Sequence, residues 1–263
     1  MKNNSLLTVI SIIFVLFALG SSCGPEPPPP PPPPIPIPTS VTDIDGNRYS
    51  VKQFGNTLWM TENLKVTQYD TLSPRSGEPI AVATYNQSVD INKPYYIDVS
   101  DFEDSPYTDN LTENIRNSFG LLYNWSAAAG TTENNTTAGG WIQGICPNGW
   151  VLPTADDWKE LVSILGGDKA AGQPLKSRNG WYTDIGSDVS GMCCYPVGLA
   201  ANNFVSLVGQ QTMFWSSTSQ LGDNAKSTVL KLFYDSDEAE MPNIFKYQAS
   251  SVRCVWHIPM PEN

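Results

Sequence analysis

Histidine is nearly absent from this sequence. His257 is the only one among 263 residues, so a zinc site built from several imidazoles is excluded by count. A Ser–His–Asp or Cys–His catalytic machine would depend on that residue alone. A lone histidine beside Trp256 is more typical of packing or of the surface than of a general base. Glycosidase chemistry with two carboxylates stays open, because spacing along the chain does not reveal separation in space.

Basic residues and nucleotide-binding motifs are also scarce. Lys and Arg together number 15 against 26 Asp and Glu, which gives a formal net charge of −11. No cluster of Lys and Arg interleaved with aromatic residues occurs, which argues against a nucleic-acid partner. Neither the GxxxxGK[ST] motif nor a dinucleotide fingerprint is present, so nucleotide chemistry has no support.

The N-terminus resembles a bacterial lipoprotein signal. Lys2 precedes an apolar run over residues 6–19 that is too short to predict a membrane span, and the letters "GSSC" follow it. We therefore predict a signal peptide over residues 1–22, with Cys23 as the lipidated first residue of the mature chain. The predicted location is the outer membrane or cell surface. An ordinary cleaved signal with a free Cys23 and an uncleaved anchor are the alternatives.

A proline-rich segment follows Cys23. Such a run favours polyproline II, so residues 25–38 would form a semi-rigid stalk of roughly 40 Å. We assign residues 23–40 to the lipidated cysteine and stalk. The remaining residues, 41–263, are enough for one large domain with its own core.

One helix is predicted from its local signals. Thr154 can accept the backbone N–H of Asp157 as an N-cap, and Asp157 stands where a capping box needs an acid. Gly166 and Gly167 supply the stop. Four apolar residues at helical spacing form one buried face: Trp158, Leu161, Val162 and Leu165.

Short strands are predicted on both sides of this helix. Asp45-Gly46 and the turn around Gly55 separate the first runs. The polar sequence of residues 67–117 indicates long loops with one short strand. The sequence of residues 118–129 indicates a strand or the start of a helix. Residues 179–192 look like a loop, and the later runs at 214–219, 227–234 and 250–257 alternate. This order favours an α+β domain with a mainly antiparallel sheet.

Several sequence blocks carry a family resemblance. They are "VTDIDGNRYSV", "LWMTENLKV", "FGLLYNWSAA", "CPNGWVLPTADDWKEL", "FWSSTS" and "SVRCV". Together they resemble the Fibrobacter succinogenes major paralogous domain family, whose members are typically surface or secreted proteins of Bacteroidetes-like bacteria and often lipoproteins. Two blocks are also similar to C-type-lectin-like and sulfatase-modifying-factor folds. The resemblance implies a C-type-lectin-like fold with short strands, one or two helices and long loops.

The cysteines are interpreted with this resemblance in mind. An exported protein lies in a compartment that favours disulfides. In lectin-like folds the last strand returns beside the first segments, so the resemblance implies a Cys146–Cys254 disulfide that staples the fold. Cys193 and Cys194 depart from the family pattern. They could form a vicinal disulfide, stay as two thiols or pair elsewhere, and a metal or redox role is the minor alternative.

Candidate ligand-binding residues lie in or beside the loops of the later half. They are Trp181, Tyr182, Asn202, Asn203 and Trp215. Aromatic faces and amides are the groups that sugar or peptide recognition uses. Packing in the core is the alternative for Trp181 and above all for Trp215. Asp184 and Asp188 are candidate metal ligands, with calcium as the only cofactor considered, although no EF-hand pattern and no lectin calcium tripeptide accompanies them.

These observations favour a binding protein. We expect a surface-anchored binding or adhesion lipoprotein that recognises an extracellular glycan or protein, as a pilus or adhesin component, and that is not an enzyme. Enzymes that modify sulfatases use a cysteine pair late in the chain, where "SVRCVWH" has one. The alternative function is a secreted hydrolase that acts on carbohydrate with two carboxylates.

Overall fold

A computed structural model describes residues 36–83, 93–99, 115, 117–131, 141–183, 186–201 and 204–259. The chain divides into two units, residues 1–37 and 38–263. The first unit lies outside the described residues except for its last two. The predicted signal peptide, Cys23 and most of the predicted stalk are therefore outside them as well.

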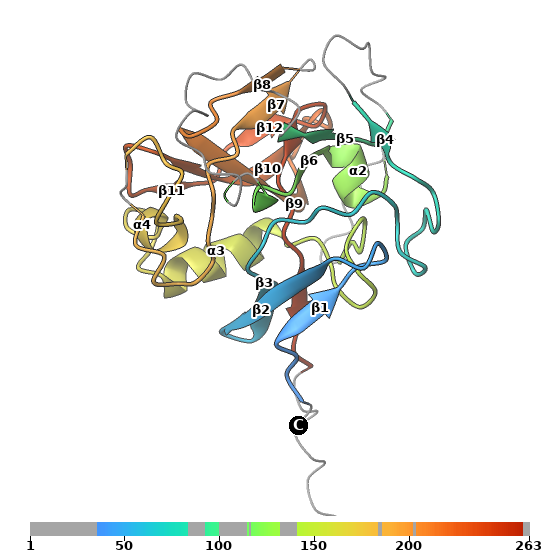
Figure 1. The fold of residues 1–263 in the computed structure, drawn as a ribbon, viewed down its shortest axis with the longest axis horizontal. Helices are drawn as coiled ribbons and strands as arrows, with labels where there is room; N and C mark the ends of the chain where they lie inside the picture. The colour runs from blue at the N-terminus through green and yellow to red at the C-terminus, as the bar shows by residue number, and fades with distance from the viewer. Residues whose placement is uncertain are drawn as a thin grey trace, which may run out of the picture. The chain divides into compact units, whose positions relative to one another are not determined.

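The first sheet has the order β1-β2-β3-β14. It is built from β1 (Ser40–Thr42), β2 (Arg48–Phe54), β3 (Thr57–Met60) and β14 (Val255–His257), and all its pairs are antiparallel (Figure 1). Gly46 has φ 86° in the turn between β1 and β2, and its N–H donates to the Asp43 carbonyl at 3.0 Å. Gly55, with φ 56°, turns β2 into β3. Both predicted turns are confirmed.

The second sheet contains the longest strands. β9 (Gln211–Ser219) pairs antiparallel with β10 (Lys226–Phe233), and β10 also pairs with β11 (Ala239–Glu240) and β12 (Asn243–Phe245). The first seven residues of β9 are buried, whereas β10 alternates more closely between buried and half-buried positions. This difference places β9 between layers of the domain, where both of its faces are covered.

The third sheet has six strands in the order β4-β5-β6-β13-β7-β8. Their bounds are Ala81–Val82, Tyr95–Asp98, Leu121–Asn124, Ala249–Ser250, Leu199–Ala201 and Phe204–Ser206. β4 pairs parallel with β5, and the other pairs are antiparallel. The described part of residues 67–117 thus contains two short strands, β4 and β5, where the sequence predicted one.

Three helices are described: α2 (Trp125–Ala129), α3 (Ala155–Ile164) and α4 (Gly172–Leu175). α3 is the predicted helix, and both halves of its capping box form between Thr154 and Asp157. Trp158, Leu161 and Val162 are buried on its inner face, while Leu165 caps the helix and is half-buried. The helix packs on β9 and β10, and Trp158 lies against Trp59 of β3 with ring centroids 4.4 Å apart.

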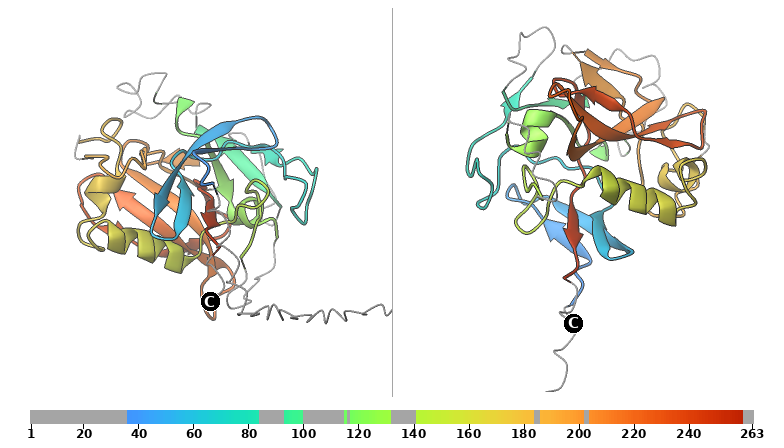
Figure 2. Two further views of the ribbon diagram at one scale, coloured as in Figure 1. Left: turned by 90° about the horizontal axis from the view of Figure 1, so that it is seen from below. Right: turned by 180° about the vertical axis from the view of Figure 1, so that it is seen from behind.

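The last segment of the domain, residues 249–257, joins all three sheets. β13 lies between β6 and β7, and Ser251 bridges to Phe214 of β9. β14 then pairs with β3, so the end of the chain lies beside its first strands (Figure 2). The domain is therefore α+β with mainly antiparallel strands, as the sequence predicted.

Candidate binding site

The candidate site is built on the segment from Trp141 to Leu152. Its ends meet where the Leu152 N–H donates to the Ile142 carbonyl at 2.8 Å, and Ile145 N–H donates to Ala128 of α2 at 3.1 Å. Gly144 has φ 55°, and a Cβ at this position would lie 2.0 Å from the Ala128 carbonyl oxygen. Only glycine fits this close approach, so the segment packs directly onto the end of α2.

A disulfide holds the same segment to the last strand. Cys146 and Cys254 are bonded across 108 residues, with 5.8 Å between their Cα atoms, and both are fully buried. The predicted pairing is confirmed. The two cysteines meet because the segments that carry them lie side by side: Val151 forms an antiparallel bridge with Val255, the residue after Cys254.

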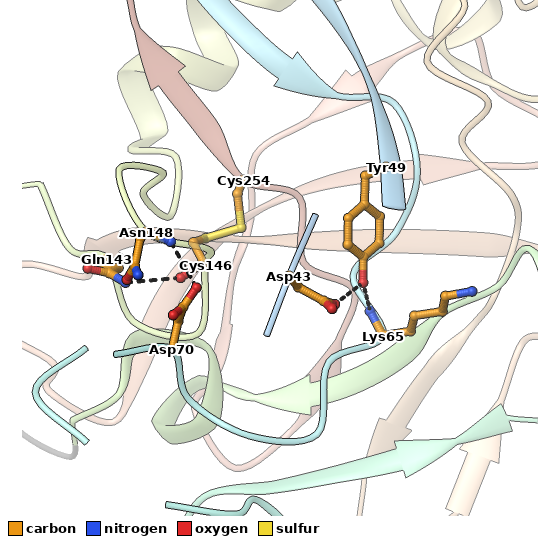
Figure 3. The surroundings of a disulfide bond; sticks show 8 residues. All are labelled: Asp43, Tyr49, Lys65, Asp70, Gln143, Cys146, Asn148 and Cys254. Carbon is orange, nitrogen blue, oxygen red and sulfur yellow. Dashed lines mark hydrogen bonds between the residues drawn. A yellow bond between two sulfur atoms is a disulfide. The ribbon is translucent and has the colours of Figure 1, made fainter. Parts of the chain in front are cut away.

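Polar side chains next to the disulfide connect this segment to the loop after Tyr69. Figure 3 shows Asn148 between Asp70 and Gln143, beside the sulfur bridge. Asn148 N–H donates to Asp70 Oδ2 at 3.1 Å, and Gln143 Nε2 donates to Asn148 Oδ1 at 3.1 Å. The same oxygen accepts the Leu72 N–H at 3.0 Å. These hydrogen bonds hold the loop after Tyr69 and the segment from Trp141 to Leu152 in a fixed position relative to each other.

A pocket of about 390 Å³ opens between this loop and this segment. Its lining consists of Leu72, Pro74, Ala129, Gly130, Thr131, Trp141, Ile142, Gln143 and Gly144. None of these residues is charged, and the polar groups are an amide, a hydroxyl and the backbone. A pocket with apolar area and a few directed polar groups is typical of small-molecule recognition.

Trp141 distinguishes this pocket from the rest of the domain. All eight tryptophans lie among the described residues. Trp141 is 63% exposed, Trp256 is half-buried, and the other six are buried. A large aromatic side chain left mostly in solvent beside a pocket offers apolar area to a ligand.

The ring of Trp141 is stacked on His257. Their ring centroids are 4.5 Å apart and their planes are inclined by 10°. His257 Nε2 lies 2.7 Å from Asp157 Oδ1, and Asp157 Oδ2 accepts both the N–H and the hydroxyl of Thr154 at 2.7 Å. The nitrogen that faces the carboxylate carries the proton, since an ionised carboxylate only accepts hydrogen bonds.

The histidine and aspartate do not form a nucleophile-activating pair with the described residues. His257 Nδ1 is buried and has no hydrogen-bond partner among them. A catalytic triad needs a hydroxyl or thiol on the second ring nitrogen. The geometry instead connects Trp141, through His257 and Asp157, to the first turn of α3.

A second pocket, of about 210 Å³, opens beside β2 and has charged walls. Arg48 and Lys65 contribute cations, and the Glu62 carboxylate accepts from Ser50 N–H at 2.8 Å. Tyr49 is buried there, and its hydroxyl donates to Asp43 at 2.6 Å (Figure 3). Burial and that hydrogen bond raise the pKa of the Tyr49 hydroxyl. This pocket therefore presents no exposed aromatic face.

Two of the sequence-predicted ligand residues are core residues. Trp181 is 5% exposed, and its indole N–H donates to the Cys194 carbonyl at 3.2 Å. Trp215 is fully buried and donates to the Tyr123 carbonyl at 2.7 Å. Neither ring has a face that a ligand could reach. The prediction that they contact a ligand is corrected, because a loop-like sequence describes the backbone and not where the side chain packs.

The other predicted residues lie apart from the pocket or outside the described residues. Tyr182 is 59% exposed and meets Tyr234 edge-on, with ring centroids 5.3 Å apart. Asn202, Asn203 and Asp184 lie outside the described residues. Asp188 has φ 49° and accepts the N–H of Cys193 at 2.8 Å. Among the described residues no group of three or more His, Cys, Asp or Glu could hold a metal.

Cys193 and Cys194 are free thiols. The Cys193 thiol donates to Asp188 Oδ2 at 3.0 Å, and Cys194 is fully buried. Burial raises the pKa of Cys193 to about 12 and that of Cys194 to about 11, and Asp188 contributes to both shifts. Raised values describe unreactive thiols at neutral pH. Of the three alternatives left open by the sequence, the structure shows two unpaired thiols.

The fold and the pocket define a disulfide-linked antiparallel α+β domain with one exposed tryptophan at a binding-sized cavity. The chain belongs to the Fibrobacter succinogenes major domain family, whose model matches residues 53–256. The resemblance carried by the sequence blocks is thereby confirmed. The chain matches no curated protein and no solved structure. In the described part of the chain, no helix has the length and apolarity needed to cross a membrane.

Sequence reasoning missed Trp141, Asp157 and His257 as parts of one site. Asp157 was recognised only as a helix cap, and His257 as a packing or surface residue. Trp141 follows two glycines in "AGGWIQG", and an aromatic residue after a glycine-rich stretch is the one local signal that could have drawn attention to it.

Proposed function

We propose that this protein is a non-enzymatic recognition module that binds an extracellular glycan or protein through the pocket beside Trp141. The observation that carries the proposal is the exposure of this tryptophan, since the other seven are buried or half-buried. An exposed indole provides a flat apolar face, and the Gln143 amide oxygen, the Thr131 hydroxyl and backbone groups of the wall can provide directed hydrogen bonds. This combination suits a sugar ring or an aromatic-binding peptide segment.

A carboxylate-dependent hydrolase is the second candidate function. Such an enzyme needs two carboxyl groups about 5–10 Å apart that flank the scissile bond. The described lining of the pocket contains no Asp or Glu. The nearest acid of the adjoining network, Asp70, accepts hydrogen bonds from Asn148 and Thr71. The composition of the wall thus favours binding over hydrolysis.

The proposed setting is the cell surface, with the domain anchored to the outer membrane through lipidated Cys23 and displayed on the proline-rich stalk as a pilus or adhesin component. The support is the sequence pattern of residues 1–40. A Cys23→Ser variant tests it: we expect the domain to leave the membrane fraction for the soluble fraction. Retention in the membrane fraction would instead favour an uncleaved anchor.

A C-type-lectin-like arrangement is part of the proposal. Its support is the pairing of β14 with β3, which brings the end of the domain beside its beginning, and a disulfide that joins the last strand region to the segment before α3. An experimental structure, superposed on lectin-like domains, tests this assignment. Strands that follow a different connectivity would overturn it.

The binding proposal is tested with a glycan array on which hydrolysis products are assayed in parallel. We expect retention of a glycan without turnover, and weakening by about 1–3 kcal/mol in Trp141→Ala, as loss of an aromatic stacking partner costs elsewhere. Tyr182→Ala is the matched control, because Tyr182 is similarly exposed and lies outside the pocket. Turnover of a sugar would favour the hydrolase, and equal binding by both variants would place the site elsewhere.

A further inference from the structure

His257 covers one face of Trp141 and is itself fixed. The two rings are nearly parallel, at 10°, with centroids 4.5 Å apart. The imidazole side chain is 18% exposed and the Asp157 carboxylate 11% exposed. Their 2.7 Å hydrogen bond is therefore largely shielded from water, where a charge-assisted bond is stronger than at the surface.

Asp157 cannot move without disturbing α3. Its second oxygen accepts from the backbone and side chain of Thr154, which completes the capping box. His257 is held equally firmly at the backbone, because it pairs with Thr57 at the end of β14. The imidazole is thus anchored to a helix and to a sheet, while Trp141 lies outside the helices and strands.

His257 does not belong to the pocket wall, whereas Trp141 does. The face of the indole that meets the imidazole is closed to a ligand by the stack, while the side chain as a whole is 63% exposed, so the rest of the ring is open to one. Without a stacking partner, an indole that is 63% exposed would rotate between side-chain conformers, and binding would have to order it at a cost in affinity.

We propose that His257 is a positioning residue that holds Trp141 as a preformed platform for an uncharged sugar ring. This inference rests on the proposed binding function and assigns a ligand class to the same pocket. The wall residues that the structure describes carry no charge, and the chain has a net charge of −11, which disfavours sulfated or uronic-acid sugars. The apolar face of a pyranose can pack on the indole, while its hydroxyls meet the amide and backbone groups of the wall.

The first experiment measures Trp141 in the full chain without any ligand. Iodide quenches exposed tryptophans, and the difference between the wild type and Trp141→Phe isolates the contribution of Trp141. We expect His257→Ala to increase that contribution and to shorten the fluorescence anisotropy decay. His257→Phe, which keeps a flat ring and loses the bond to Asp157, should give a value between those of the wild type and His257→Ala. Tyr247→Ala is the control, since it breaks the other stack, with Phe245.

The second experiment measures affinity for an array of uncharged and anionic saccharides. We expect binding of uncharged members only, and about two- to tenfold weaker binding by His257→Ala, as the cost of ordering one side chain predicts. Unchanged quenching and unchanged affinity in His257→Ala would overturn the positioning role. Binding of anionic members only would overturn the ligand class. Increased quenching together with no sugar binding by the wild type would contradict the proposed function and still support the positioning of Trp141.

Discussion

Arg253 donates its Nε–H to Asn63 Oδ1 at 2.9 Å, and both side chains are buried. The two terminal nitrogens of the guanidinium donate to the carbonyls of Met192 and Cys193. The guanidinium also lies over the ring of Phe214, 5.0 Å from its centroid. One side chain of the last segment thus ties together the loop after β3, the 192–194 segment and β9.

Arg253→Met should destabilise the domain by about 3 kcal/mol or more, because it leaves buried acceptors without donors. Arg253→Lys should recover only part of this loss, since an ammonium cannot reproduce the planar fork. Urea unfolding of the full chain measures the free energy of unfolding. Arg178→Met is the control, because Arg178 is exposed and surface changes usually stay within about 0.5 kcal/mol. Equal midpoints for both variants would contradict the role of Arg253.

Alkylation of the cysteines should distinguish the disulfide from the two free thiols. In native protein we expect no alkylation of Cys146 or Cys254, and slow alkylation of Cys193 and Cys194 because of their raised pKa values. Unfolding without reductant should expose only the latter two. Peptide mapping by mass spectrometry identifies each site. A label on Cys146 before reduction, or a Cys193–Cys194 cross-link, would contradict the structure.

Breaking the disulfide should lower stability as well. The closed loop spans 108 residues, and the chain-entropy model assigns about 4–5 kcal/mol to a loop of that length. We expect the Cys146→Ala, Cys254→Ala double variant to lose this amount in urea unfolding. The double variant should also lose sugar binding at low urea concentrations, because the disulfide holds the pocket wall to the last segment.

Features that depend on neighbouring residues could be predicted from the sequence. The Thr154 cap, the turn at Gly46 and the buried face of α3 are set by interactions within a few residues, and the structure has each of them. The cysteine pairing came from a family resemblance, because it joins segments far apart in the chain. The parallel pairing of β4 with β5 had no local signal.

The site itself could not be predicted in this way. Asp157 and His257 are 100 residues apart, and their contact exists only because β14 returns beside β3 and α3. Trp181 and Trp141 both follow glycine in the sequence, yet one is 5% and the other 63% exposed. Trp181 belongs to a buried cluster with Leu175 of α4 and Phe214 of β9, and local composition does not encode that packing.

Removal of divalent cations should leave both stability and sugar binding unchanged. The described residues of the pocket wall include no carboxylate, and the Asp188 carboxylate accepts from the N–H and thiol of Cys193. Thermal unfolding with EDTA and with added calcium provides the measurement, since a bound ion raises the midpoint by mass action. A midpoint that rises with calcium, and no longer does so in Asp188→Asn, would instead establish a calcium site at that loop.

Lys176 should contribute a stability that rises with pH above about 8. This side chain is fully buried, its Nζ donates to the Ser236 carbonyl at 2.5 Å, and it lies over the Trp181 ring, 5.1 Å from its centroid. Burial lowers the pKa of Lys176 from 10.5 to about 8, although Asp237 and Asp235 oppose the shift. Between these two values the unfolded chain binds more protons than the folded one. The free energy of unfolding therefore increases with pH in that window.

The measurement is urea unfolding between pH 7.5 and 9, below the range in which the phenols of the unfolded chain titrate. The thiols of Cys193 and Cys194 begin to ionise in the unfolded chain in this window and lower the slope equally in every variant, so each variant is compared with the wild type. Lys176→Met should reduce the slope of stability against pH, and Lys159→Met should not, because Lys159 is exposed on α3. Lys246 has its pKa lowered to about 8 by burial as well, so replacing both lysines should reduce the slope further than replacing Lys176 alone. A slope unchanged in Lys176→Met would show that its amine is hydrated in the folded state, contrary to its position beneath the Ser236 carbonyl.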